Sequence, residues 1–234
     1  MTASSTAVDR VTRARETLFQ AIEESAAVDL SFLQRAPVEN GWEAPPDLLR
    51  LLYALVTELR PRHVVEFGSG VSTAVLARAA RKGGGTVISS IESDPKFTGA
   101  TFELVGDDSV VVALQCAPLV ARVRNGCLGP SYLVDRSLLA STAPADLVFI
   151  DGPPEVLGGR RTMLPQALEY AQCGSIVLFD DADRDGERGA LTSWEQILGN
   201  AAELHRPRGF VRGLAALILV APTKAQIRMS PKGT

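Results

Sequence analysis

Short apolar segments alternate with amphipathic segments over most of the chain. From about residue 63 onward, several apolar segments are rich in Val and Ile and unbroken, as is typical of strands buried on both faces of a parallel sheet. We predict strands at His63–Phe67, Thr86–Glu92, Val110–Leu114, Leu147–Asp151, Ser175–Asp180, Glu203–His205 and Leu214–Val220. Helical spacing predicts helices at Ser72–Arg81, Pro95–Leu104, Arg160–Ala171 and Glu187–Leu198. Their alternation indicates an α/β fold: a doubly wound, mostly parallel seven-stranded sheet with helices on both faces.

Two further helices are predicted before the first strand, at 8–27 and 46–59. We therefore expect residues 1–60 to be an N-terminal helical extension of one domain, 61–223 to be its sheet-containing body, and 224–234 to be a tail. Segment 115–145 has no regular pattern and contains several Pro and Gly residues. Such insertions often form the wall of a substrate pocket.

Composition narrows the classes of partner and compartment. The chain has 234 residues, 46% of them hydrophobic, a net charge of −3 and a pI near 5.5. A basic excess is absent, so no nucleic-acid partner is expected. Three cysteines without metal-ligand spacing indicate free thiols in a reducing compartment. No apolar run is long enough to span a membrane, and the polar start lacks a signal-peptide pattern. We expect a cytoplasmic protein without membrane contact, with a homodimer through the N-terminal helices left open.

The clearest motif follows the first predicted strand, where Gly68-Ser69-Gly70 leads into a helix. The two glycines permit a tight turn and close approach of a ligand to the backbone. Ser72 and Thr73 open the helix, whose free N–H groups favour an anionic group such as a carboxylate. Glu92 ends the second strand, where an acid can accept hydrogen bonds from ribose hydroxyls.

The same layout occurs in NAD-binding domains, so an oxidoreductase is one alternative. Two residues disfavour it: Thr73 stands where the third glycine of G-x-G-x-x-G would lie, and crowds the pyrophosphate position. Glu66 ends the first strand, and its charge would repel a pyrophosphate but suit a cationic ligand.

Four segments together resemble the class I S-adenosylmethionine (SAM)-dependent methyltransferases, which have a Rossmann-like fold. They are VVEFGSGVST (64–73), SIESDP (90–95), DLVFIDGPP (146–154) and SIVLFDDADR (175–184). The resemblance implies that Glu66 and the glycine turn, with Gly68, Gly70, Ser72 and Thr73, hold the methionine end of the cofactor. It further implies that Glu92 binds ribose, that Cys116 and Ala117 border adenine, and that Asp151 lies on the sulfonium side.

Three carboxylates end neighbouring strands of the predicted sheet: Asp151 after one, Asp180 and Asp181 after the next. Adjacent strands lie about 4.8 Å apart, so these acids should converge. A bound cation or bound protons would relieve their repulsion, and oxygen ligands suit Mg²⁺, Ca²⁺ or Mn²⁺. Their placement resembles that in metal-dependent, catechol-type O-methyltransferases. The resemblance implies that Asp151, Asp180 and Asp181 bind a divalent metal, such as Mg²⁺, that orients and acidifies an acceptor hydroxyl.

One position departs from that family, because Pro154 stands where a lysine base is usual. We name Asp151 and His205 as the catalytic residues, with Glu155, Asp183 and Tyr132 as other bases that the sequence leaves open. In the plain alternative, the acids following the strands form a solvated turn and a helix cap.

The leading hypothesis is therefore metal-assisted O-methylation of a small hydroxylated metabolite. A metal-independent methyltransferase, an NAD-dependent oxidoreductase and a non-catalytic nucleotide-binding protein remain as alternatives. Arg160 and Arg161 are either anchors for an anionic acceptor or, more simply, a solvated helix start. Trp42, Tyr132 and Leu133 are candidates for the acceptor wall, and the low aromatic content of 6% favours a sugar or polyketide over a phenol.

Overall fold

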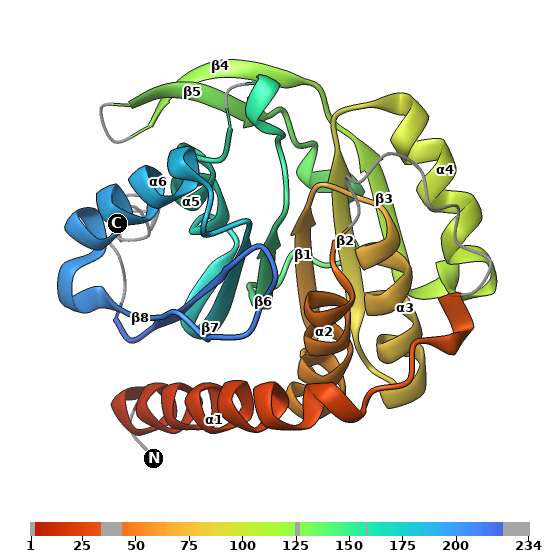
Figure 1. Ribbon diagram of the computed structural model, residues 1–234, viewed down its shortest axis with the longest axis horizontal. Helices are drawn as coiled ribbons and strands as arrows, with labels where there is room; N and C mark the ends of the chain where they lie inside the picture. Colours follow the sequence, from red (N-terminus) through yellow and green to blue (C-terminus); the bar gives the residue numbers. More distant parts are fainter. Residues whose placement is uncertain (1–2, 34–43, 125–126, 158, 222–234) are drawn as a thin grey trace.

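The computed structural model describes residues 3–33, 44–124, 127–157 and 159–221. Its centre is a seven-stranded sheet of order β3-β2-β1-β6-β7-β9-β8 (Figure 1), in which β9 runs opposite to the other strands. The strands are β1 (His63–Phe67), β2 (Val87–Glu92), β3 (Val112–Cys116), β6 (Ala145–Ile150), β7 (Ala171–Asp180), β8 (Ala202–His205) and β9 (Leu214–Leu219). The strand order reverses between β1 and β6, and open α/β sheets bind ligands at such a point.

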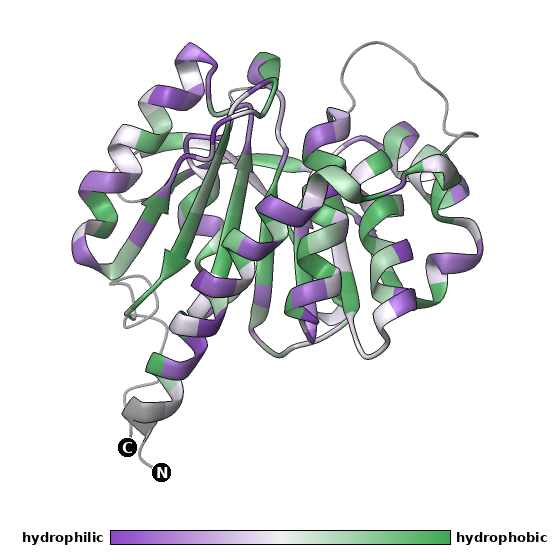
Figure 2. Ribbon diagram, turned by 60° about the horizontal axis from the view of Figure 1, so that its bottom comes forward, coloured by the Kyte–Doolittle hydropathy of each residue, from purple (hydrophilic) through white to green (hydrophobic). Residues whose placement is uncertain are grey.

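Helices cover both faces of the sheet. They are α1 (Ala3–Glu24), α2 (Pro46–Leu59), α3 (Val71–Gly83), α4 (Pro95–Val105), α5 (Met163–Ala167) and α6 (Asp185–Leu198). Alternate strand residues supply two separate cores: Val64 packs with α1, α2 and α3, whereas Val65 packs with α5 and α6. Figure 2 shows the strands as hydrophobic along most of their length, as expected for a sheet buried on both sides.

The fold class predicted from the sequence is confirmed, and most strand positions agree within two residues. The helix predicted at Arg160–Ala171 is shorter than expected, since α5 spans only Met163–Ala167 and β7 begins at Ala171. The third strand begins at Val112 rather than Val110 because a 3₁₀ turn occupies Gly106–Val111.

Segment 115–145 is more regular than its sequence indicates. It contains an antiparallel hairpin of β4 (Leu119–Arg124) and β5 (Cys127–Tyr132), separate from the main sheet. Gln166 fixes the end of the hairpin: its amide accepts from Tyr132 N at 3.0 Å and donates to Tyr132 O at 2.8 Å. Within the described residues, no helix has the length and apolar character needed to cross a membrane. The predicted tail at 224–234 lies outside the described residues.

Candidate functional site

A cavity of about 530 Å³ opens at the carboxyl ends of β1, β2, β6 and β7. This volume is within the range of small-molecule sites. Its lining joins the glycine turn, the acid after β2, the loop after β6 and the end of β7. The lining residues are Gly68, Ser69, Glu92, Ser93, Asp94, Phe97, Tyr132, Asp151, Gly152, Pro154, Glu155, Val156, Leu157, Arg160, Asp181 and Arg184.

Two glycines bring the ends of β1 and β6 into contact at the floor of this cavity. Gly68 has φ +90°, and a Cβ there would lie 2.9 Å from the backbone nitrogen of Gly152. A Cβ on Gly152 would lie 2.3 Å from the hydroxyl oxygen of Tyr132 and 3.1 Å from Cα of Gly68. The backbone therefore leaves no room for a side chain at either position.

Gly152→Ala should accordingly destabilise the protein by about 1–3 kcal/mol, the usual cost of overpacking. Gly189→Ala is the matched control, because an added Cβ in the exposed interior of α6 meets nothing within 4 Å. That control should stabilise the protein by about 0.5–1 kcal/mol. Urea denaturation measures both changes, and equal stability of the two variants would refute the close approach.

Glu92 lies at the end of β2 and faces the cavity. One carboxylate oxygen accepts from Ser93 N at 2.6 Å and Asp94 N at 2.9 Å, and the other accepts from Ser69 N at 2.9 Å. These bonds link Glu92 to the glycine turn and fix its carboxylate at the pocket wall. The position is the one from which an acid can bind ribose hydroxyls.

Glu66 takes a different place from the one the sequence indicated. Its side chain is fully buried and does not line the cavity. Its carboxyl oxygens accept from the hydroxyls of Ser72 at 2.7 Å, Thr73 at 2.6 Å and Ser90 at 2.6 Å. Glu66 thereby ties the first turn of α3 to β2 beneath the glycine turn, and its contact with the methionine end stays a prediction. Ser72 and Thr73 point to it rather than into the cavity.

The buried position of Glu66 predicts a pH dependence of stability. Burial raises the pKa of Glu66 from 4.5 to about 7. The native state thus holds a proton that the unfolded chain releases above pH 4.5, so the contribution of Glu66 to stability declines as the pH rises from 4.5 to 7. Wild type should lose about 3 kcal/mol relative to Glu66→Gln across this window. Urea denaturation of both proteins at pH 5 and pH 8 measures the loss, and a constant difference would contradict the assignment.

The remaining predicted cofactor residues divide into two groups. Gly68 lines the cavity, whereas Gly70 does not, although its N–H donates to the Thr73 hydroxyl at 3.0 Å. Cys116 is exposed outside the cavity lining, and Ala117 is buried next to it. Cys116 and Ala117, which the sequence predicts to border adenine, therefore do not line this cavity.

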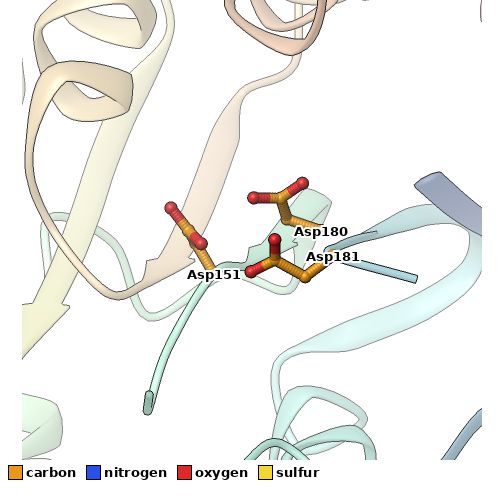
Figure 3. Close-up of side chains that lie close together, drawn as sticks. All are labelled: Asp151, Asp180 and Asp181. Carbon is orange, nitrogen blue, oxygen red and sulfur yellow. The ribbon is translucent and has the colours of Figure 1, made fainter. Parts of the chain in front are cut away.

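The three predicted metal-binding acids do converge. Asp151, Asp180 and Asp181 each offer a carboxylate oxygen within 4.8 Å of the others (Figure 3). Burial, together with the charges of Asp151 and Asp181, raises the pKa of Asp180 to about 8. Burial also raises the pKa of Asp151, although Arg160 opposes the shift. Asp151 and Asp181 line the cavity, whereas Asp180 is buried and does not line it.

Arg160 lines the cavity and is the residue whose burial the sequence did not indicate. Its side chain is only 4% exposed, so the solvated helix start considered for it is wrong. One terminal nitrogen donates to Asp151 Oδ1 at 2.9 Å and Asp181 Oδ2 at 2.8 Å, and the other donates to the backbone oxygen of Asp180 at 2.7 Å. These bonds also leave Arg160 committed to the acids rather than free to anchor an anionic acceptor. Arg161 is exposed.

The acid cluster is a poor fit for a divalent ion because a guanidinium already bridges two of its three members. Arg184 makes a second ion pair with Asp181 Oδ2, at 2.9 Å. A divalent ion on the same carboxylates would stand close to two like charges. The oxygens Asp180 Oδ2 and Asp181 Oδ1 are buried without a hydrogen-bond partner.

His205 lies away from this site. It ends β8, outside the cavity lining, and its ring packs edge-on against Phe19 of α1 at 5.2 Å between centroids. Its Nε2 is 3.5 Å from Glu203 Oε2. The catalytic role predicted for His205 is therefore not supported by its position.

Some of the other candidate bases and wall residues line the cavity and others do not. Glu155 lines the cavity and Asp183 does not. Tyr132 lines it, although burial raises its pKa far above the usual range and makes it a poor base. Leu133 is half exposed outside the lining, and Trp42 lies outside the described residues.

Comparison with solved structures gives the same fold repeatedly. The O-methyltransferase from Bacillus cereus, solved with S-adenosylhomocysteine (SAH), matches with a TM-score of 0.55 at 18% identity, over 87% of this chain and 90% of that chain. An SAH-bound methyltransferase from Podospora anserina matches with 0.55 at 16%, over 87% of each chain. The tomaymycin-synthesis O-methyltransferase TomG from Streptomyces achromogenes, solved with SAM, matches with 0.51 at 21%, over 87% of this chain and 89% of that chain.

Sequence comparison gives the family. No curated protein matches the chain. The family described as "Methyltransferase domain" matches residues 65–182, just over half of the chain. This segment runs from β1 to the end of β7 and contains Glu92, Asp151, Arg160, Asp180 and Asp181. The chain therefore belongs to the methyltransferase-domain family.

Proposed function

We propose that the protein transfers the methyl group of SAM to a hydroxyl oxygen of a small acceptor. The observation that carries this proposal is that the glycine turn, Glu92 and Asp151 line the same cavity. The family match and the SAM- or SAH-bound structural neighbours support the choice of methyl donor.

The cavity offers a consistent position for SAM. Glu92 accepts hydrogen bonds from the ribose hydroxyls, and the glycine turn at Gly68 and Ser69 lets the methionine part approach the backbone. The sulfonium is then directed toward Asp151 and Asp181, and its positive charge suits this acid-rich side of the cavity.

Bound SAM supplies the methyl group and its sulfonium is the leaving centre. The acceptor oxygen forms the new bond to the methyl carbon as the carbon–sulfur bond breaks, which yields a methyl ether and SAH. Asp151 is the carboxylate best placed to take the hydroxyl proton, since its side chain is one-fifth exposed and lines the cavity. Its raised pKa improves it as a base near neutral pH.

The mouth of the cavity indicates the kind of acceptor. Val156 and Leu157 line it and are 78% and 50% exposed, next to Pro154. An apolar part of the acceptor can cover these side chains and gain hydrophobic free energy. We therefore propose a small hydroxylated metabolite with an apolar body, closer to a polyketide than to a sugar.

Metal assistance was the expectation from the sequence, with Asp151, Asp180 and Asp181 as ligands. Arg160 already occupies oxygens of two of these acids. The proposed proton transfer is accordingly assigned to Asp151 without a divalent ion.

The test uses methyl-tritiated SAM and a panel of hydroxylated compounds, from sugars to polyketides and phenols, with a matched set of amines. We expect extractable label in apolar hydroxylated products, with one SAH formed per methyl transferred. Label confined to amine acceptors, or no label with any compound although SAM is bound, would refute O-methylation.

A further inference from the structure

Arg160 is almost completely buried where it meets the cavity. Besides its three hydrogen bonds to the acid cluster, its guanidinium lies 5.9 Å from the centre of the Phe179 ring. Three residues after Arg160, α5 begins at Met163, whose N–H donates to Arg160 O at 2.9 Å. The following residue is fixed too, since Trp194 Nε1 donates to Arg161 O at 3.0 Å. Hydrogen bonds from Met163 of α5 and from the Trp194 side chain of α6 thus fix the backbone that carries the guanidinium.

Two of the three acids in the cluster already have cationic partners within the protein. Asp151 and Asp181 are both within 2.9 Å of Arg160, and Asp181 has Arg184 as a second partner. Arg160 is almost completely buried, whereas Arg184 is 43% exposed. Buried carboxylates are costly unless a cation is paired with them. Arg160 is the buried cation that fulfils this condition.

We propose that Arg160 is the resident cation of this site and takes the place that a divalent metal would otherwise fill. It acts as a positioning residue, because it holds Asp151 and Asp181 in fixed directions through one nitrogen. A planar guanidinium suits this task because its donors have a fixed geometry. The consequence for catalysis, that methyl transfer needs no divalent ion, rests on the proposed function. The consequence for metal binding, that wild type binds divalent ions weakly, is independent of the proposed function.

The experiment measures Mn²⁺ binding by electron paramagnetic resonance after treatment with EDTA. Wild type should bind Mn²⁺ with a dissociation constant of about 1 mM or weaker, since two guanidinium groups repel the ion. Arg160→Gln leaves the acids without their buried cation, so it should bind Mn²⁺ at least about tenfold more tightly, a difference of about 1.4 kcal/mol. Mn²⁺ should also raise the melting temperature of that variant. Arg161→Gln removes an adjacent, exposed charge and should behave as wild type.

Micromolar Mn²⁺ binding by wild type that is lost in Asp180→Asn would overturn the proposal, and this measurement does not depend on whether Arg160→Gln folds. Equal Mn²⁺ affinity of wild type and folded Arg160→Gln would also overturn it. Arg160→Lys retains the charge and should remain without tight Mn²⁺ binding. Calorimetry with SAH on the same samples separates the two claims: absent SAH binding with the expected Mn²⁺ pattern refutes the proposed function and leaves the role of Arg160 intact.

Discussion

Glu92→Ala is expected to weaken SAH binding by at least about 100-fold, because each hydrogen bond between a ribose hydroxyl and a carboxylate is worth about 1.5–3 kcal/mol. The carboxylate is prepared for this contact by the backbone N–H groups of Ser69, Ser93 and Asp94. Those bonds remove the freedom of the side chain before the cofactor arrives, so little ordering remains to oppose binding.

Isothermal calorimetry measures this effect directly. Glu103→Ala on the exposed side of α4 removes the same group without touching the cavity and should leave the SAH affinity at the wild-type value. Glu92→Gln keeps the size of the side chain. It therefore separates loss of the ribose contact from a disruption of the glycine turn that Glu92 holds in place. SAH affinity within about threefold of wild type in both Glu92 variants would contradict the ribose assignment.

Asp151→Asn should lower kcat by about 10²–10⁴-fold, the usual contribution of general base catalysis. The amide retains the shape and one acceptor for Arg160, but it cannot take a proton from the acceptor hydroxyl. SAH binding should change far less than kcat, since the sulfur product carries no positive charge. Initial rates with methyl-tritiated SAM measure kcat, once an acceptor has been found in the panel.

Asp183→Asn provides the comparison for this loss. Asp183 is an exposed acid near the end of β7 that does not line the cavity, and the sequence left it open as a base. Its variant should keep wild-type kcat. A loss in Asp183→Asn with none in Asp151→Asn would move the base to the other acid.

The sequence was sufficient to predict the sheet and the convergence of the acids. The unbroken apolar segments identified the buried strands, and parallel strands bring their carboxyl ends to one edge whatever the details of packing. That rule alone placed Asp151, Asp180 and Asp181 together. The β4–β5 hairpin was missed, although Asn125-Gly126 is a strong hairpin signal when flanked by alternating residues such as Arg122-Val123-Arg124.

The direction of individual side chains could not be predicted from the sequence. Glu66 lies near the end of β1 as expected, but its carboxyl turns inward because Ser72, Thr73 and Ser90 offer three hydroxyls there. Arg160 precedes a short helix and has the sequence pattern of a solvated residue. Its partners Asp151 and Asp181 come beside it only when the loop after β6 returns over β7.

Calorimetric titration of the purified protein with SAH, after EDTA treatment and with NAD⁺ as the parallel ligand, tests the central claim most directly. We predict micromolar binding of SAH (a Kd of 1 µM corresponds to about −8 kcal/mol), unchanged by added Mg²⁺, and no binding of NAD⁺. Binding of NAD⁺ with none of SAH, with or without Mg²⁺, would contradict the proposed methyl donor and require a different function for the cavity.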